Sequence, residues 1–121
     1  MISFFNKKPT VNMLTTRMSK MVGYVYTTYD ALVTAFGKES GLHDDYKSMH
    51  QFDIKQLPGY NYPISIYDWK ADFYERGDDF TNDLSIFNDR YYWWHIGAQD
   101  EGAVVNVARH MGLSKDQYRY M

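Results

Sequence analysis

Residues 90–97, with the sequence RYYWWHIG, constrain the fold of this chain more than any other segment. Large aromatic rings and a histidine follow one another there. Successive side chains of a β-strand point to opposite faces of a sheet, so a strand at this position carries rings on both faces. One face can pack in the core. The other face must be covered by something else, because a monomeric protein rarely leaves a large aromatic surface in water.

The composition indicates a single globular domain. The chain has 121 residues, 18% of them aromatic, and a formal net charge of −2. That charge gives no general electrostatic reason to bind nucleic acid or an anionic membrane. No cysteine is present, which excludes a disulfide framework and a thiolate metal site. The apolar stretches are too short for a signal peptide or a membrane span, and we therefore expect a cytoplasmic protein.

Three segments have the periodicity of amphipathic helices. They span residues 10–23, 27–37 and 100–112. In the second, Thr27 and Asp30 resemble a capping box, and Gly37 fits the left-handed position after a helix. In the third, Gly112 ends a stripe of small apolar side chains, and Ser114 with Gln117 predicts one further turn. Residues 1–23 carry basic but no acidic side chains, so we expect a basic N-terminal arm that includes the first helix.

Three other segments alternate as strands do, over residues 46–54, 61–70 and 90–97. The sequence Leu57-Pro58-Gly59-Tyr60 predicts a tight turn that joins the first two as an antiparallel hairpin. Residues 71–89 have no clean period and form a long acidic insertion. Residues 24–121 therefore predict one α+β domain: an antiparallel sheet of three to four strands, with helices packed on one face.

Alternation also predicts which side chains lie on each face. The helix-covered face should carry Ile64, Ile66, Tyr92, Trp94 and Ile96. The opposite face should carry Tyr67, Trp69, Tyr91, Trp93 and His95. We predict that this second face lies in a homo-oligomer interface, with a ligand site at its edge.

Short motifs along residues 29–112 resemble a family of small phage proteins. They read LVTAFGK, YKSMHQFDI, ISIYDWK, WWHIGA and AVVNVARHMG. The chain is similar to the phage Thoeris anti-defence family, which sequesters cyclic ADP-ribose signals. Ala98 stands where a second glycine is expected, and Lys38-Glu39 replaces the usual Glu-Pro.

This resemblance implies a function rather than a set of residues. It implies a non-enzymatic protein in the cytoplasm of an infected bacterium. Such a protein binds a cyclic nucleotide immune signal in a pocket at a dimer edge. Some members also hold cyclic oligonucleotides at a separate site. Residues 1–23 lie outside the resemblance.

Candidate ligand residues follow from the chemistry of such a nucleotide. Adenine needs an aromatic plane, the pyrophosphate needs a cation, and the ribose and base edges need amide or imidazole groups. The candidates are Arg109, Asn106, His95, Tyr91, Trp93, Lys47 and Arg90. Each also has a plain structural role available, such as a helix-end cation for Arg109 or dimer packing for Tyr91. We expect no catalytic residue, metal or cofactor.

Three alternatives remain open. Asp53, Asp68 and Lys70 have the order of a Mg²⁺-dependent nuclease, although the pattern is short and often accidental. His43, Asp44, Asp45 and His50 offer possible metal ligands, but not at a recognised spacing. The acidic insertion 71–89 could instead bind and block a host defence or DNA-handling protein.

Overall fold

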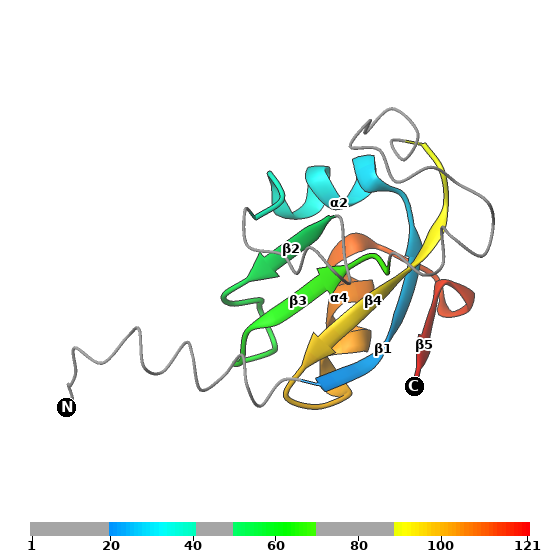
Figure 1. Cartoon of the computed structure of the whole chain (residues 1–121). Helices are drawn as coiled ribbons and strands as arrows, with labels where there is room; N and C mark the ends of the chain where they lie inside the picture. The colour runs from blue at the N-terminus through cyan, green and yellow to red at the C-terminus, as the bar shows by residue number, and fades with distance from the viewer. Residues whose placement is uncertain (1–19, 41–49, 70–88) are drawn as a thin grey trace.

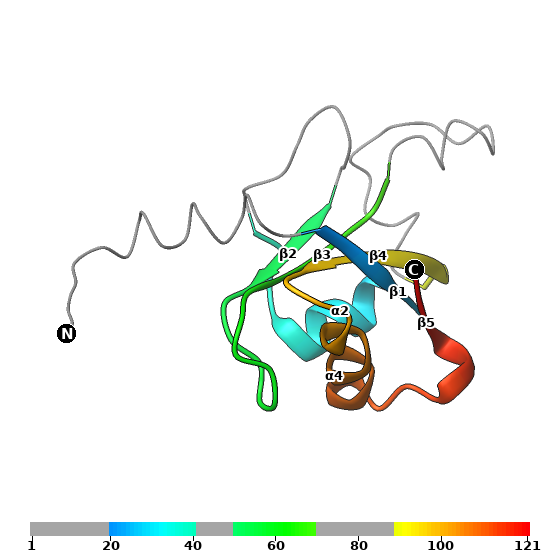
Figure 2. The same ribbon diagram turned by 90° about the horizontal axis from the view of Figure 1, so that it is seen from below.

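The computed structural model describes residues 20–40, 50–69 and 89–121. They form a five-stranded antiparallel sheet in the order β2-β3-β4-β1-β5, with α2 and α4 on one of its faces (Figures 1 and 2). The elements are β1 (Lys20–Thr27), α2 (Tyr29–Phe36), β2 (Gln51–Ile54), β3 (Ile64–Tyr67), β4 (Tyr92–Ala98), α4 (Gly102–Met111), the 3-10 turn η2 (Lys115–Gln117) and β5 (Tyr118–Tyr120). The expected α+β class is confirmed, with more strands than expected.

Strand β1 is the largest departure from the sequence prediction. The helix predicted for residues 10–23 is wrong at residues 20–23, which begin a strand paired with β4. Residues 10–19 lie outside the described residues. Aromatic and β-branched side chains at residues 24–27 favour a strand. The pairing register shifts between Met21 and Gly23, and this irregularity hides the two-residue period in the sequence.

Helix α2 begins one residue later than expected. Thr28, rather than Thr27, is the N-cap, and its Oγ1 accepts a hydrogen bond of 3.1 Å from the backbone N–H of Ala31. Gly37 follows the helix with φ 87° and ψ −160°, a conformation that favours glycine but is not the expected left-handed helical one. Its N–H donates to the carbonyl of Val33 at 2.7 Å, which closes the last turn.

The β2–β3 hairpin is confirmed. Gly59 has φ 89°, and the N–H of Tyr60 donates to the carbonyl of Leu57 at 2.9 Å. Both strands are shorter than predicted. Phe52 pairs with Ile66 in the middle of the hairpin, and both side chains are buried.

Helix α4 and the segment after it lead the chain back to the sheet. Gly112 has the left-handed conformation expected after the helix, and the capping box of Ser114 and Gln117 is present in η2. The following strand, β5, pairs antiparallel with β1. The sequence did not predict β5, because three residues are too few to show a period. No helix in the described part of the chain is long and apolar enough to cross a membrane.

The core lies between the sheet and its two helices. All the strand side chains predicted for this face are buried: Ile64, Ile66, Tyr92, Trp94 and Ile96. Helix α4 contributes Ala103, Val104, Val107 and Ala108, whose small side chains let the helix approach the sheet closely. Burial of each large side chain contributes about 1.5–3 kcal/mol, so this layer supplies much of the stability.

Gly23 of β1 allows two elements to approach the same strand. A Cβ at this position would collide with the carbonyl oxygen of Arg119 and would lie 2.7 Å from Cγ2 of Val104. The first atom belongs to the β5 backbone and the second to α4. Any side chain here would therefore push one of these elements away from β1.

We expect Gly23→Ala to lower the free energy of unfolding by about 1–3 kcal/mol, the usual range for overpacking. Urea unfolding followed by tryptophan fluorescence measures this change. Lys55→Ala is the control, because Lys55 is exposed and its substitution should change the free energy of unfolding by less than about 0.5 kcal/mol. Unchanged stability of Gly23→Ala would contradict the close approach of β5 and α4.

Candidate functional site

The sheet face opposite the two helices carries the aromatic surface. We call it the open face, because none of the described helices covers it (Figure 2). Its rings belong to Tyr24, Tyr26, Tyr67, Trp69, Tyr91, Trp93 and His95. The sequence predicted those of β3 and β4 and their flanking residues. Strand β1 adds Tyr24 opposite His95 and Tyr26 opposite Trp93.

One part of the open face, the central cluster, consists of Tyr24, Tyr67 and Trp69 around His95. The His95 ring lies 5.2 Å from Tyr24, 5.4 Å from Tyr67 and 6.0 Å from Trp69, measured between centroids. Its Nδ1 is 3.1 Å from the sulfur of Met21. Burial raises the pKa of Tyr67 above its ordinary value of 10.0, and Tyr24 adds to the shift. The Tyr67 hydroxyl is therefore neutral, and able to donate a hydrogen bond, at physiological pH.

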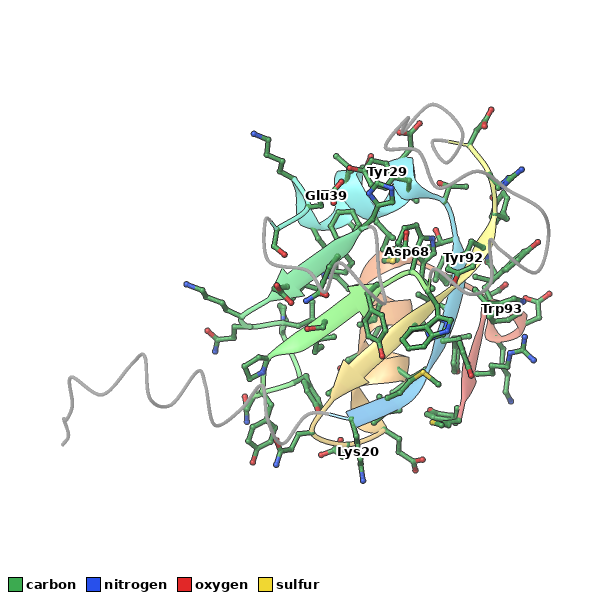
Figure 3. The ribbon with its side chains drawn as sticks, viewed as in Figure 1. Lys20, Tyr29, Glu39, Asp68, Tyr92 and Trp93 are labelled. Atoms are coloured by element: carbon green, nitrogen blue, oxygen red, sulfur yellow. The ribbon has the colours of Figure 1, made fainter. Side chains whose placement is uncertain are left out.

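The other part, the rim cluster, consists of Tyr26, Tyr91, Trp93 and Arg119 beside β5. Tyr26 lies 4.9 Å from Trp93 and 5.2 Å from Tyr91, between ring centroids. Tyr91 is 53% exposed, so one ring of the cluster is open to solvent. Figure 3 shows Trp93 at the side of the sheet next to β5.

Arg119 brings a positive charge to the rim cluster. Its guanidinium carbon lies 4.0 Å from the Trp93 ring centroid and 5.6 Å from that of Tyr24. These distances are within the range of cation–π attraction. A solvent-accessible ring and an exposed cation on one surface can hold a planar group and an anionic group of the same ligand.

The structure places the predicted site residues in two separate regions. His95 belongs to the central cluster, and Tyr91 and Trp93 belong to the rim cluster. Arg109 and Asn106 lie on α4, which packs against the other face of the sheet. One chain therefore does not bring these two groups together.

Arg109 and Asn106 form a small surface with the β2–β3 turn. The Asn106 amide donates to the carbonyl of Gly102 at 2.8 Å, and Arg109 Nη1 donates to Asn106 Oδ1 at 3.4 Å. A Cβ at Gly59 would lie 2.7 Å from that same Oδ1, so the turn packs closely on the helix. A ligand role for this pair stays a prediction for this separate surface.

Two further predicted site residues are Arg90 and Lys47, and one residue of the site, Arg119, was not predicted. Arg90 is half-buried just before β4, and Lys47 lies outside the described residues. Sequence reasoning missed Arg119, because its position on the open face depends on the pairing of β5 with β1. A basic residue between two tyrosines in YRY was the available signal.

The carboxylates of the nuclease alternative are not brought together. Asp53 is exposed and accepts hydrogen bonds from Ser40 Oγ at 2.8 Å, Ser65 Oγ at 2.7 Å and Gln51 Nε2 at 2.9 Å. Asp68 is fully buried, and its Oδ1 accepts from the N–H of His50 at 3.0 Å.

His50 is three residues from Asp53 along the chain, or about 10 Å in extended backbone. Asp53 and Asp68 are therefore separated by a similar distance. Lys70, His43, Asp44 and Asp45 lie outside the described residues. Within residues 20–40, 50–69 and 89–121, no group of three His, Cys, Asp or Glu side chains could hold a metal.

A polar cluster joins the first residue of α2, Tyr29, to Glu39 after that helix and to His50 just before β2. The Tyr29 hydroxyl donates to Glu39 Oε2 at 2.6 Å, and His50 Nδ1 lies 3.2 Å from the same oxygen (Figure 3 labels Tyr29 and Glu39). His50 is only 3% exposed. Burial, and then the hydrogen bond to Glu39, raises the pKa of Tyr29 well above its ordinary value of 10.0. The Tyr29 hydroxyl and His50 Nδ1 both face the Glu39 carboxylate, and this arrangement indicates a structural role for Glu39.

No protein-family model, curated protein or solved structure matches the chain. Its function must therefore be inferred from the geometry of the site.

The raised pKa of Tyr29 predicts a pH-dependent stability. Above pH 10, Tyr29 loses its proton in the unfolded chain but keeps it in the folded protein. The contribution of Tyr29 to the free energy of unfolding is therefore complete below its ordinary pKa of 10.0. It declines as the pH rises toward the higher pKa of the folded protein. We expect Tyr29→Phe to lower the free energy of unfolding at pH 8 by about 1.5–3 kcal/mol, because Glu39 loses a hydrogen bond.

Above pH 10, the free energy of unfolding of Tyr29→Phe should fall with pH less steeply than that of the unsubstituted protein. The difference in slope should reach up to about 1.4 kcal/mol per pH unit. Urea unfolding between pH 8 and pH 11 measures both effects. Tyr62→Phe is the matched control, since that hydroxyl is on an exposed ring of the hairpin loop. Equal alkaline slopes for Tyr29→Phe and the unsubstituted protein would rule out this account of the cluster.

Proposed function

We propose that the protein binds a nucleotide at the rim cluster of the open face and sequesters it without altering it. The observation that carries this proposal is the row of rings on the sheet face that the described helices leave bare. At its edge, Tyr91 is 53% exposed beside Tyr26. Stacking of one base on an aromatic ring contributes about 1–3 kcal/mol and is available to every base.

The sheet gives this surface the rigidity that tight binding requires. Tyr26 lies on β1, and Tyr91 directly precedes β4, so the strand pairing fixes the two rings relative to one another. A preorganised surface loses little side-chain entropy when a ligand binds. Sequestration further requires only high affinity and a sufficient amount of protein. A nanomolar Kd corresponds to about −12 kcal/mol.

The ligand class comes from the resemblance rather than from the fold. The motifs ISIYDWK and WWHIGA favour a cyclic nucleotide immune signal of the cyclic ADP-ribose type. Both motifs contribute rings to the open face, Tyr67 and Trp69 from the first and Trp93 and His95 from the second. In this proposal the protein is a phage anti-defence protein that keeps the free signal below the level that activates a host effector.

Retention of an intact ligand tests the proposed function. The protein is incubated with cyclic ADP-ribose, separated from free ligand by filtration and then heat-denatured. Chromatography should recover unchanged cyclic ADP-ribose from the denatured sample. New products formed only with Mg²⁺ would support a nuclease-like enzyme instead. No retention would favour the alternative in which the protein blocks a host protein.

Substitution of Tyr91 tests the position of the ligand. We expect Tyr91→Ala to weaken the binding of cyclic ADP-ribose about tenfold or more in calorimetry, because a stacking ring is lost. Tyr62→Ala is the matched control. Tyr62 is 48% exposed, close to the 53% of Tyr91, but lies in the β2–β3 loop. An equal loss of affinity in the two variants would show that the ligand does not stack on Tyr91 at the rim cluster.

The proposal includes assembly into a homo-oligomer, with a second copy against the open face beside the ligand. The ring of Tyr91, which is 53% exposed at the rim cluster, supports such contact. Sedimentation velocity at micromolar concentration should give at least the mass of a dimer. A monomer mass would mean that copies of the chain do not cover this face.

A further inference from the structure

We infer that Arg119 recognises the phosphate of the ligand, so that the open face selects nucleotides over nucleosides. This inference rests on the proposed function and names the chemical group that the site recognises. It concerns a residue on β5, outside the segment that carries the sequence resemblance.

The position of Arg119 on the open face is set by the sheet. Strand β5 pairs with β1 so that Arg119 lies opposite Tyr24, and Tyr24 in turn lies opposite His95 on β4. Side chains of directly opposed residues lie on the same face of a sheet. The pairing therefore delivers this cation to the aromatic surface, although it comes from the last residues of the chain.

The neighbours of Arg119 leave its hydrogen-bonding groups available. Its guanidinium carbon is 4.0 Å from the Trp93 centroid, close enough for the flat group to rest on the ring. Guanidinium N–H groups lie in the plane of the group and point outward, in a fork that matches two oxygens of a phosphate. Aromatic packing thus orients the guanidinium without occupying its donors.

Within residues 20–40, 50–69 and 89–121, no carboxylate neutralises the charge of Arg119. Among the described residues, its side chain forms contacts with the rings of Trp93 and Tyr24 but no ion pair. Asp116, the acidic residue closest in sequence, accepts a hydrogen bond from Ser114 Oγ. An exposed guanidinium that rests on aromatic rings keeps its full attraction for an anion.

The remaining rings of the rim cluster complete a site for one nucleotide. Tyr26, opposite Trp93 on β1, and the exposed Tyr91 next to it provide the plane on which a base stacks. The guanidinium of Arg119 lies over the neighbouring Trp93 ring, 4.0 Å from its centroid, where the phosphate of the same nucleotide can reach it. Base and phosphate are recognised by different residues, and the two contributions can be measured separately.

Calorimetry with adenosine 5′-monophosphate and with adenosine separates the two contributions. The full-length protein should bind the monophosphate at least tenfold more tightly than the nucleoside. Arg119→Gln should remove this preference. We expect it to lower the affinity for the monophosphate at least tenfold and to change the affinity for adenosine by less than twofold. Arg119→Lys retains the charge but not the planar fork, and should recover part of the preference.

The control is Lys55→Gln, which removes an equal charge from an exposed residue just beyond β2. It should change neither affinity. Raising the salt concentration should weaken monophosphate binding by the unsubstituted protein and by Lys55→Gln, but much less by Arg119→Gln. A structural role for Arg119 would not produce this difference in salt dependence.

The outcomes distinguish this inference from the proposed function. If Arg119→Gln lowers the affinities for adenosine and its monophosphate equally, Arg119 supports the aromatic surface and does not recognise phosphate. Equal affinity of the unsubstituted protein for the two compounds overturns the inference in the same way. In both cases nucleotide capture still stands. If the protein binds neither compound nor cyclic ADP-ribose, the proposed function fails, and the inference fails with it.

Discussion

The pairing of β1 with β4 is the interaction on which the rest of the structure depends. Its register places Val25 opposite Trp94, and both side chains lie in the core beneath the helices. The same register places Tyr26 opposite Trp93 on the open face. Because the side-chain period of a strand is two residues, a slip of one residue would exchange the two faces of β1. Core packing and the aromatic surface are therefore fixed by the same hydrogen bonds.

Alternation within single strands predicted much of the fold. The odd and even positions of β4 were assigned to the correct faces, and the buried residues of β3 and α4 were anticipated. Strand β1 was not recognised, because the irregularity at Met21 and Gly23 breaks its period and suggested a helix. Strand β5 was not recognised because it is short. Both failures concern strands whose existence depends on a partner far away in the sequence.

The candidate site shows the same limit of sequence reasoning. The rings of β4 were identified, but Arg109 and Asn106 were grouped with them although α4 packs on the opposite side of the sheet. Periodicity gives the faces of one element and says nothing of which side of a sheet a helix will cover. Arg119 illustrates the converse, since only the β1–β5 pairing places it on the open face.

The distribution of polar contacts separates structural from functional charges. Glu39 accepts the hydroxyl of Tyr29 and faces His50, and Asp53 accepts three side-chain hydrogen bonds. These carboxylates accept hydrogen bonds from other residues of the fold and therefore have a structural role. In the described part of the chain, Arg119 has aromatic rings as its neighbours instead of an acid. Rings hold a guanidinium in place without satisfying its donors, so its capacity for an anion remains. A sheet that holds a guanidinium on an aromatic surface in this way is suited to bind a planar, anionic ligand.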